Sequence, residues 1–173
     1  MPAKHYTAPP PMQIDTGSTY HAIIKTNRGT ILLRLHPTEV PLTVNNFIVL
    51  ARDGYYDGVT FHRVVPHFLI QGGDPTGTGK GGPGYRFKDE PVRRPYRVGT
   101  VAMANAGPDT NGSQFFICVE DQPNLPPGYT IFGHVVAGMD VVRSIRVGDV
   151  MQVVTIGQDD SFVSADITVP ARS

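Results

Sequence analysis

Apolar residues in this chain fall mainly in short runs that are separated by glycine, proline, asparagine and aspartate. Runs of this length between turn-forming residues are typical of β-strands. They occupy residues 22–26, 30–35, 60–65, 68–71, 98–104, 115–119, 130–136 and 150–156. The first two runs are joined by Asn27-Arg28-Gly29, which favours a tight hairpin connection. The pattern therefore predicts eight strands.

One segment shows a clear helical period. It follows Pro41, which is tolerated in a first helical turn, and Gly54 can end it in the left-handed conformation. Between them, apolar residues recur at the i, i+3, i+4 and i+7 positions, namely Val44, Phe47, Ile48 and Ala51. A second short helix is predicted over 139–145. Eight strands, two brief helices and no strand–helix alternation predict a mainly β protein, an antiparallel barrel that is closed or nearly closed.

The chain divides into three parts. Residues 1–19 form a proline-rich extension, in which Pro9-Pro10-Pro11 favours an extended backbone. Residues 20–157 hold all the predicted strands and helices, and a chain of 173 residues suits one domain of this size. Residues 158–173 form a tail with one strand-like piece at 166–169.

Charge and cysteine content remove several function classes. Lysine plus arginine equals aspartate plus glutamate at 15 each, so nothing indicates a nucleic acid or an anionic membrane as partner. The single cysteine, Cys118, can form neither an intramolecular disulfide nor a cysteine metal cluster. No stretch approaches the roughly 20 apolar residues of a membrane helix. We expect a cytoplasmic protein, although export from a longer precursor stays open.

Polar residues interrupt the apolar runs where chemistry can be placed. Arg63 lies within one predicted strand and Gln71 ends the next, so the two side chains can meet if these strands pair. A surface arginine beside a surface glutamine explains the same spacing, and spacing alone favours it.

Two later segments can line a groove. Small residues around Asn105 allow another backbone to approach, and Phe115 and Phe116 point to opposite faces of a strand, one toward the core and the other toward a groove. Leu125 and Tyr129 can add an apolar wall and a hydroxyl. Ordinary loops with buried rings are the alternative in both cases.

Two motifs point to different chemistry. Gly77-Thr78-Gly79-Lys80-Gly81-Gly82 matches the dinucleotide fingerprint of a nucleotide-dependent enzyme. That motif needs a helix N-terminus to receive the phosphates, but Pro83-Gly84 follows, so a loop is favoured. His62 and His67 have no third ligand at metal spacing, so we expect no metal.

Together, the polar segments resemble the signature of the cyclophilin-type peptidyl-prolyl cis/trans isomerases, most of all the compact bacterial members. The likeness runs from about residue 20 to about residue 156, with matching order and separation. The matching segments are Phe61-His62-Arg63-Val64-Val65-Pro66 with Phe68, Gln71-Gly72-Gly73-Asp74, Met103-Ala104-Asn105-Ala106-Gly107-Pro108 and Asn111-Gly112-Ser113-Gln114-Phe115-Phe116-Ile117.

The resemblance implies a closed eight-stranded antiparallel barrel capped by two short α-helices. It also implies an enzyme that accelerates rotation about X-Pro bonds without covalent chemistry, cofactor or metal. By position, Arg63 would be the catalytic arginine, with Gln71 supporting it and Phe68 beside the proline ring. The implied substrate-binding residues are Leu69, Ala104, Asn105, Ala106, Gln114, Phe116, Leu125 and Tyr129.

Two positions depart from the family pattern. Tyr129 stands where the family usually has a histidine, and Asn124 stands near a tryptophan that many eukaryotic members carry. A tyrosine keeps an aromatic wall and a hydrogen-bond donor, so we expect activity to survive. The missing indole counts against tight binding of cyclosporin, the family's familiar inhibitor. The implied partners of this monomer are proline-containing peptides and unfolded proteins. A proline-peptide binding module or chaperone with weak catalysis is the alternative.

Overall fold

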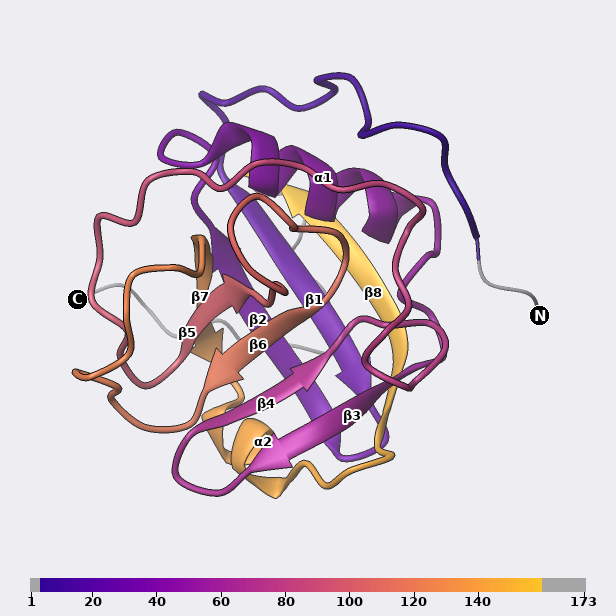
Figure 1. The fold of residues 1–173 in the computed structure, drawn as a ribbon. Coiled ribbons are helices and arrows are strands. Elements are labelled where there is room, and N and C mark those ends of the chain that lie inside the picture. The colour runs from indigo at the N-terminus through magenta and orange to yellow at the C-terminus, as the bar shows by residue number, and fades with distance from the viewer. Residues whose placement is uncertain (1–3, 160–173) are drawn as a thin grey trace.

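The short apolar runs form eight strands that pair until the sheet closes on itself in the order β1-β2-β7-β5-β6-β4-β3-β8, with every pair antiparallel (Figure 1). The computed structural model describes residues 4–159. The strands are β1 (Tyr20–Thr26), β2 (Gly29–Leu35), β3 (Val59–Val65), β4 (Leu69–Gly72), β5 (Thr100–Met103), β6 (Phe115–Cys118), β7 (Ile131–Ala137) and β8 (Val150–Gln158). The predicted barrel is therefore confirmed, and the strand ends differ from the prediction by only a few residues.

Two helices close the ends of the barrel. Helix α1 (Pro41–Arg52) lies across the upper opening in Figure 1, and α2 (Met139–Ser144) lies at the lower end. The apolar stripe of α1 is buried, because Val44, Phe47 and Ile48 each have 0% exposure. Both predicted helices are confirmed. The first turn of α1 is capped from a distant loop, where the Glu90 carboxylate accepts hydrogen bonds from the backbone N–H groups of Leu42 and Thr43.

The strands divide the apolar residues between two clusters. Inward side chains of the sheet and α1 form the main core, in which the rings of Phe47 and Phe115 pack edge to face with centroids 5.5 Å apart. The second cluster lies on the outer face of β4, β5 and β6. Successive residues of a strand point to opposite faces, so Phe115 belongs to the main core and Phe116 to the outer cluster. The expectation that one ring faces the core and its neighbour does not is confirmed.

The N-terminal extension lies along α1 (Figure 1). Asn45 of the helix accepts a hydrogen bond from the Gln13 backbone N–H at 2.8 Å and donates one to the Pro11 carbonyl at 3.1 Å. Ile14 is only 9% exposed and joins the main core. The extension thus packs on the barrel from residue 4 onward. The strand-like piece at 166–169 lies outside the described residues.

Within residues 4–159, neither helix is long and apolar enough to cross a lipid bilayer.

Candidate active site

Arg63 and Gln71 face each other across β3 and β4. The two residues are cross-strand partners, and the Arg63 guanidinium donates a hydrogen bond from Nη1 to Gln71 Oε1 at 3.0 Å. Arg63 is exposed, whereas Gln71 is half-buried. The contact predicted from the sequence is thus present. It leaves a permanently charged, planar group at the surface with most of its donors available.

Gln71 is held in turn by Gln114. The Gln71 side chain donates from Nε2 to Gln114 Oε1 at 3.2 Å, and Gln114 donates from its own Nε2 to the carbonyls of Gly79 and Gly81 at 2.9 and 3.1 Å. The two glutamines therefore connect Arg63 to the glycine-rich loop. Each amide has its oxygen toward the donor and its nitrogen toward the acceptor, so the chain of hydrogen bonds has a defined direction.

A buried carboxylate organises the glycine-rich loop. Asp74 has 0% exposure and accepts hydrogen bonds from the backbone N–H groups of Thr76, Thr78, Gly79 and Gly81 at 2.7–3.1 Å. Burial alone would raise the pKa of the Asp74 carboxyl. The hydrogen bonds from the loop outweigh burial and hold the pKa below its ordinary value. Since these amides are turned inward onto Asp74, they are not presented to a phosphate, and no helix follows the loop.

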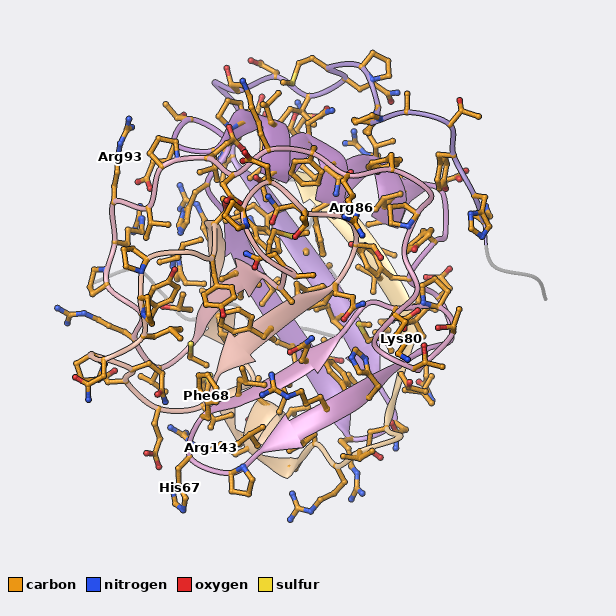
Figure 2. All side chains as sticks on the ribbon, in the orientation of Figure 1. His67, Phe68, Lys80, Arg86, Arg93 and Arg143 are labelled. Atoms are coloured by element: carbon orange, nitrogen blue, oxygen red, sulfur yellow. The ribbon has the colours of Figure 1, made fainter. Side chains whose placement is uncertain are left out.

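A patch of apolar side chains, called the slot below, lies on the outer face of the barrel, on strands next to the one that carries Arg63. Its floor is the second cluster, which includes Leu69, Phe116 and Ile131, and partly buried Phe68, Leu125 and Tyr129 pack around it. The Tyr129 ring meets Phe116 edge to face, with centroids 5.5 Å apart and an interplanar angle of 83°. Figure 2 shows Phe68 at the turn between β3 and β4. The slot thus combines residues that lie far apart in the sequence.

Tyr96, which no sequence pattern indicates, fixes one wall of the slot. Its hydroxyl donates to the Tyr129 carbonyl at 2.6 Å and accepts from the Tyr129 backbone N–H at 3.1 Å. Tyr96 is 5% exposed and belongs to the outer cluster. An aromatic residue in the irregular segment between β4 and β5 carries no periodic signal, so only the tertiary contact identifies it.

Asn105 forms part of the rim through its main chain. Its side chain is engaged internally, because Nδ2 donates to the Gly128 carbonyl at 2.7 Å and Oδ1 accepts from the Gly107 backbone N–H at 3.1 Å. No hydrogen bond from another described residue reaches its backbone N–H or carbonyl. Ala104 and Ala106 flank it with minimal side chains. An extended peptide can therefore pair with this backbone, as β-strand addition does elsewhere.

Other potentially reactive side chains are engaged in contacts within the fold. The Ser113 hydroxyl is buried, donates to the Gly73 carbonyl at 2.7 Å and lies 2.9 Å from the Tyr55 hydroxyl. His67 pairs with Glu120 at 2.7 Å instead of joining His62. Within residues 4–159, no three histidine, cysteine or carboxylate side chains converge as a metal site would require.

The fold and the site define a class before any comparison. A closed barrel that carries an exposed arginine beside an apolar slot, with a free backbone edge, can grip a peptide and its apolar ring without forming a covalent bond. Comparison with known proteins identifies the family. A model described as cyclophilin type peptidyl-prolyl cis-trans isomerase/CLD matches residues 21–168.

Individual relatives agree with that model. The peptidyl-prolyl cis-trans isomerase of Synechococcus elongatus is 52% identical over 130 residues, which cover 74% of this chain and 90% of the relative. Peptidyl-prolyl cis-trans isomerase B of Bacillus subtilis is 49% identical over 128 residues, covering 73% and 90%.

Solved structures give the same answer. A Cryptosporidium parvum cyclophilin type peptidyl-prolyl cis-trans isomerase superposes with a TM-score of 0.75 at 35% identity, covering 80% of this chain and 98% of that one. The same protein in the presence of the dipeptide Ala-Pro gives a TM-score of 0.74. This chain belongs to the cyclophilin-type peptidyl-prolyl cis-trans isomerases. The enzyme class expected from its sequence is confirmed.

Proposed function

We propose that Arg63 catalyses the rotation of X-Pro bonds whose proline ring sits in the slot floored by Leu69 and Phe116. The observation that carries this assignment is the fixed guanidinium beside the slot, held by Gln71 at 3.0 Å. Leu125 and Tyr129 complete the walls around the ring, and Phe68 flanks it. Asn105 holds the peptide backbone, with Ala104, Ala106 and Gln114 along the groove.

The physical task is to lower a rotation barrier. Partial double-bond character gives an amide a barrier of about 18–20 kcal/mol, and uncatalysed X-Pro exchange takes tens to hundreds of seconds. Reaching milliseconds requires roughly four decades in rate, which corresponds to about 5.5 kcal/mol. No bond forms or breaks, so interactions that favour the twisted amide over both planar forms are sufficient.

Arg63 provides such an interaction. When the amide twists, the proline nitrogen becomes pyramidal and recovers a lone pair that the planar form delocalises. A guanidinium hydrogen can bond to this lone pair only in the twisted state, which is the differential binding that catalysis needs. A charged hydrogen bond contributes about 1.5–3 kcal/mol. The remaining stabilisation comes from holding the ring in the slot, so that one side of the bond rotates while the other is fixed, and from removing water that solvates the planar amide.

We infer that the substrates are proline-containing peptides and unfolded chains, bound by a monomer. The presence of Ala-Pro with the Cryptosporidium relative supports this inference. The half-buried slot takes one apolar ring, and the main chain of Asn105 is independent of substrate sequence. Because Asn124 offers no indole at the slot, we expect cyclosporin to bind weakly.

Exchange NMR on a short Ala-Pro peptide tests the proposal. The wild-type chain should increase the cis–trans exchange rate, and Arg63→Ala should remove most of that increase while the circular dichroism spectrum stays the same. Arg63→Lys keeps the charge but loses the planar set of donors, so it should restore little. Arg93→Ala, at an exposed arginine that Figure 2 labels at the upper left, is the matched control. An Arg63→Ala rate equal to that of the wild type would refute the assignment.

One observation favours a second candidate, a binding module with weak turnover. Tyr129 replaces the usual histidine of the family, and its ring is already engaged by Phe116. Peptide affinity by titration, measured together with exchange, separates the two functions. Binding of the peptide with negligible exchange would favour the module.

A further inference from the structure

A hollow borders the slot at Ala104 and runs along the glycine-rich loop. It has a volume of about 850 Å³ and shares Gln71, Ala104, Asn105 and Gln114 with the groove described above. Its far wall is made by residues 79–86 and by His5 of the N-terminal extension. Because Asn105 lines this hollow, a peptide held by the Asn105 backbone lies next to it.

The charged side chains that line the hollow are all basic, and the nearest carboxylate, that of Asp74, is buried behind Gly79 and Gly81. Its lining includes Lys80, Arg86 and His5 but no aspartate or glutamate. Figure 2 shows Lys80 and Arg86 on the same side of the molecule. This excess of basic side chains is a local feature of the hollow, because the whole chain has 15 Lys and Arg residues and 15 Asp and Glu residues.

These basic groups are also available to a ligand. Elsewhere, Arg28 pairs with Asp149 at 2.9 Å and Arg94 with Glu39 at 2.6 Å. Lys80, Arg86 and His5 are all exposed. The side chains of these three residues form no hydrogen bond or ion pair with another described residue. The amide donors of Gln114, by contrast, are already directed to the loop carbonyls.

The extension is held so that His5 stays at this wall. On one side of His5, Lys4 pairs with Asp53 at 3.5 Å. On the other side, the Tyr6 backbone N–H donates to the Pro83 carbonyl at 2.8 Å, and its hydroxyl donates to Asp53. Gly84 makes the close approach possible, because a Cβ there would lie 2.5 Å from the Tyr6 carbonyl oxygen and 3.2 Å from His5 Nδ1.

The loop that carries the other two basic residues is ordered as well. Asp74 binds the amides on either side of Lys80, and Arg86 lies between Tyr85, whose hydroxyl donates to Asn46, and Phe87, which forms a β-bridge with Asn111. Three basic side chains are thus presented from a fixed backbone next to the catalytic groove.

We propose that this hollow binds the acidic side chain, carboxylate or phosphate, of a residue flanking the substrate proline, and that His5 makes the N-terminal extension part of the recognition surface. The proposal rests on the assignment of the groove as the isomerase site. Charged hydrogen bonds from Lys80 and Arg86 to an anionic oxygen provide the attraction, and exposure to solvent limits it and makes it sensitive to salt.

Peptides that differ at one flanking residue test the idea. The series carries Ala, Gln, Glu, phosphoserine or Lys at each of the three positions before and after an Ala-Pro unit, and kcat/KM is measured at low and high salt. At one of these positions, kcat/KM of the wild type should be about tenfold higher with Glu than with Lys, because two or three exposed charge pairs act together. Phosphoserine, with its larger charge, should be preferred more strongly. The comparison of Glu with phosphoserine identifies which anion the hollow favours.

Reversing the charges of the basic residues then tests whether the preference for Glu over Lys arises at this hollow. Lys80→Glu combined with Arg86→Glu should invert the Glu-to-Lys ratio, and His5→Asp should lower it. Arg93→Glu lowers the net charge by two, as each single reversal does, but at an exposed site away from the hollow, so it should leave the ratio unchanged. If the double variant fails to fold, Lys80→Gln and Arg86→Gln should each lower the ratio. Turnover of the Ala peptide reports on the isomerase site separately. A wild-type ratio of one, or a ratio that survives charge reversal, would overturn the proposal while leaving that site intact.

Discussion

The Arg63 guanidinium and the Gln71 side-chain oxygen lie 3.0 Å apart as cross-strand partners on β3 and β4. Arg63 is exposed and has a long, flexible side chain, so without a partner it would sample many rotamers and rarely point over the slot. Gln71 removes much of that freedom before the substrate arrives. It leaves the positive charge intact, because an amide is neutral.

Gln71→Ala should therefore lower kcat/KM without removing the catalytic group. We expect a loss of about tenfold, equivalent to about 1.4 kcal/mol, because Arg63 must then be ordered at the expense of binding energy. Exchange NMR on an Ala-Pro peptide measures the rate, and urea denaturation checks that the barrel is intact. Gln122→Ala is a control, since Gln122 caps the turn at His67 and does not contact Arg63. Equal rates for wild type and Gln71→Ala would mean that Gln71 does not position the arginine.

Asp74 lies further from the slot, and its replacement should affect both stability and activity. Asp74→Asn puts a donor where four backbone amides point and leaves one acceptor oxygen. We expect a loss of about 2–4 kcal/mol in the free energy of unfolding. Since the Gly79 and Gly81 carbonyls anchor Gln114, a shifted loop should also lower kcat.

Urea denaturation and peptide exchange measured on the same Asp74→Asn sample separate these two effects. Asp140→Asn, at an exposed aspartate in the first turn of α2, should cost about 0.5 kcal/mol or less. If Asp74→Asn unfolds at the wild-type urea concentration, the carboxylate does not organise the loop.

The strands and both helices could be predicted because each leaves a local signal, whereas spacing alone left the Arg63–Gln71 contact conditional on the pairing of β3 with β4. Alternation along β6 predicts that Phe115 and Phe116 separate, and a short β3–β4 connection brings Arg63 beside Gln71. The apolar slot was accessible only through the family resemblance. Its walls come from segments far apart in the chain, and no periodicity connects them.

The contacts that hold the glycine-rich loop and the N-terminal extension left no local signal in the sequence. Its composition predicts that a glycine-rich loop is flexible. In the folded protein, however, the Asp74 carboxylate at the start of the loop accepts hydrogen bonds from the backbone amides of the loop. The proline-rich composition likewise predicts only an extended backbone, and it does not indicate that Ile14 enters the main core or that Asn45 binds the backbone around it. In both cases one buried side chain determines the conformation, and its partners are recognisable only after folding.

Tyr129 should contribute to binding through its ring more than through its hydroxyl. The ring stands edge-on to Phe116 at 5.5 Å, and its backbone is fixed by Tyr96. Tyr129→Ala opens the slot and should raise KM about tenfold, because the ring contributes buried area as well as an aromatic contact of about 0.5–1.5 kcal/mol. Tyr129→Phe keeps the wall and should keep KM within about twofold. Steady-state kinetics on a proline peptide gives both values, and a similar KM for all three chains would show that Tyr129 is not part of the slot.

A pair of histidines away from the active site should make stability depend on pH. His36 is 9% exposed, its ring stacks on that of His134 with centroids 5.0 Å apart, and Nε2 lies 3.2 Å from His134 Nδ1. Burial, the nearby Arg94 guanidinium and His134 together lower the pKa of His36 to about 4, and the Glu39 carboxylate opposes them only in part. His134 is exposed as a whole residue, but partial desolvation of its ring lowers its pKa as well, with Arg94 and Arg34 adding to the effect.

The direction of the pH effect follows from proton binding. An unfolded histidine titrates near pH 6.5, whereas folded His36 titrates near pH 4, so between these values the unfolded chain binds more protons. The contribution of His36 is fully present above about pH 6.5 and is lost as the pH falls toward 4, by up to about 3 kcal/mol. Urea denaturation at pH 7.5, 5.5 and 4.5 should show this loss, and His36→Asn should reduce it.

His67→Asn provides the contrast for this prediction. His67 is exposed and pairs with Glu120, whose hydrogen bond and charge raise the pKa of His67. A raised pKa in the folded chain favours the protonated native state, so this pair should not contribute to the loss of stability in acid. Replacing His67 should therefore leave the acid-dependent loss at least as large as in the wild type. If His36→Asn and the wild type lose equal stability between pH 7.5 and 4.5, the buried histidine is not the group that titrates.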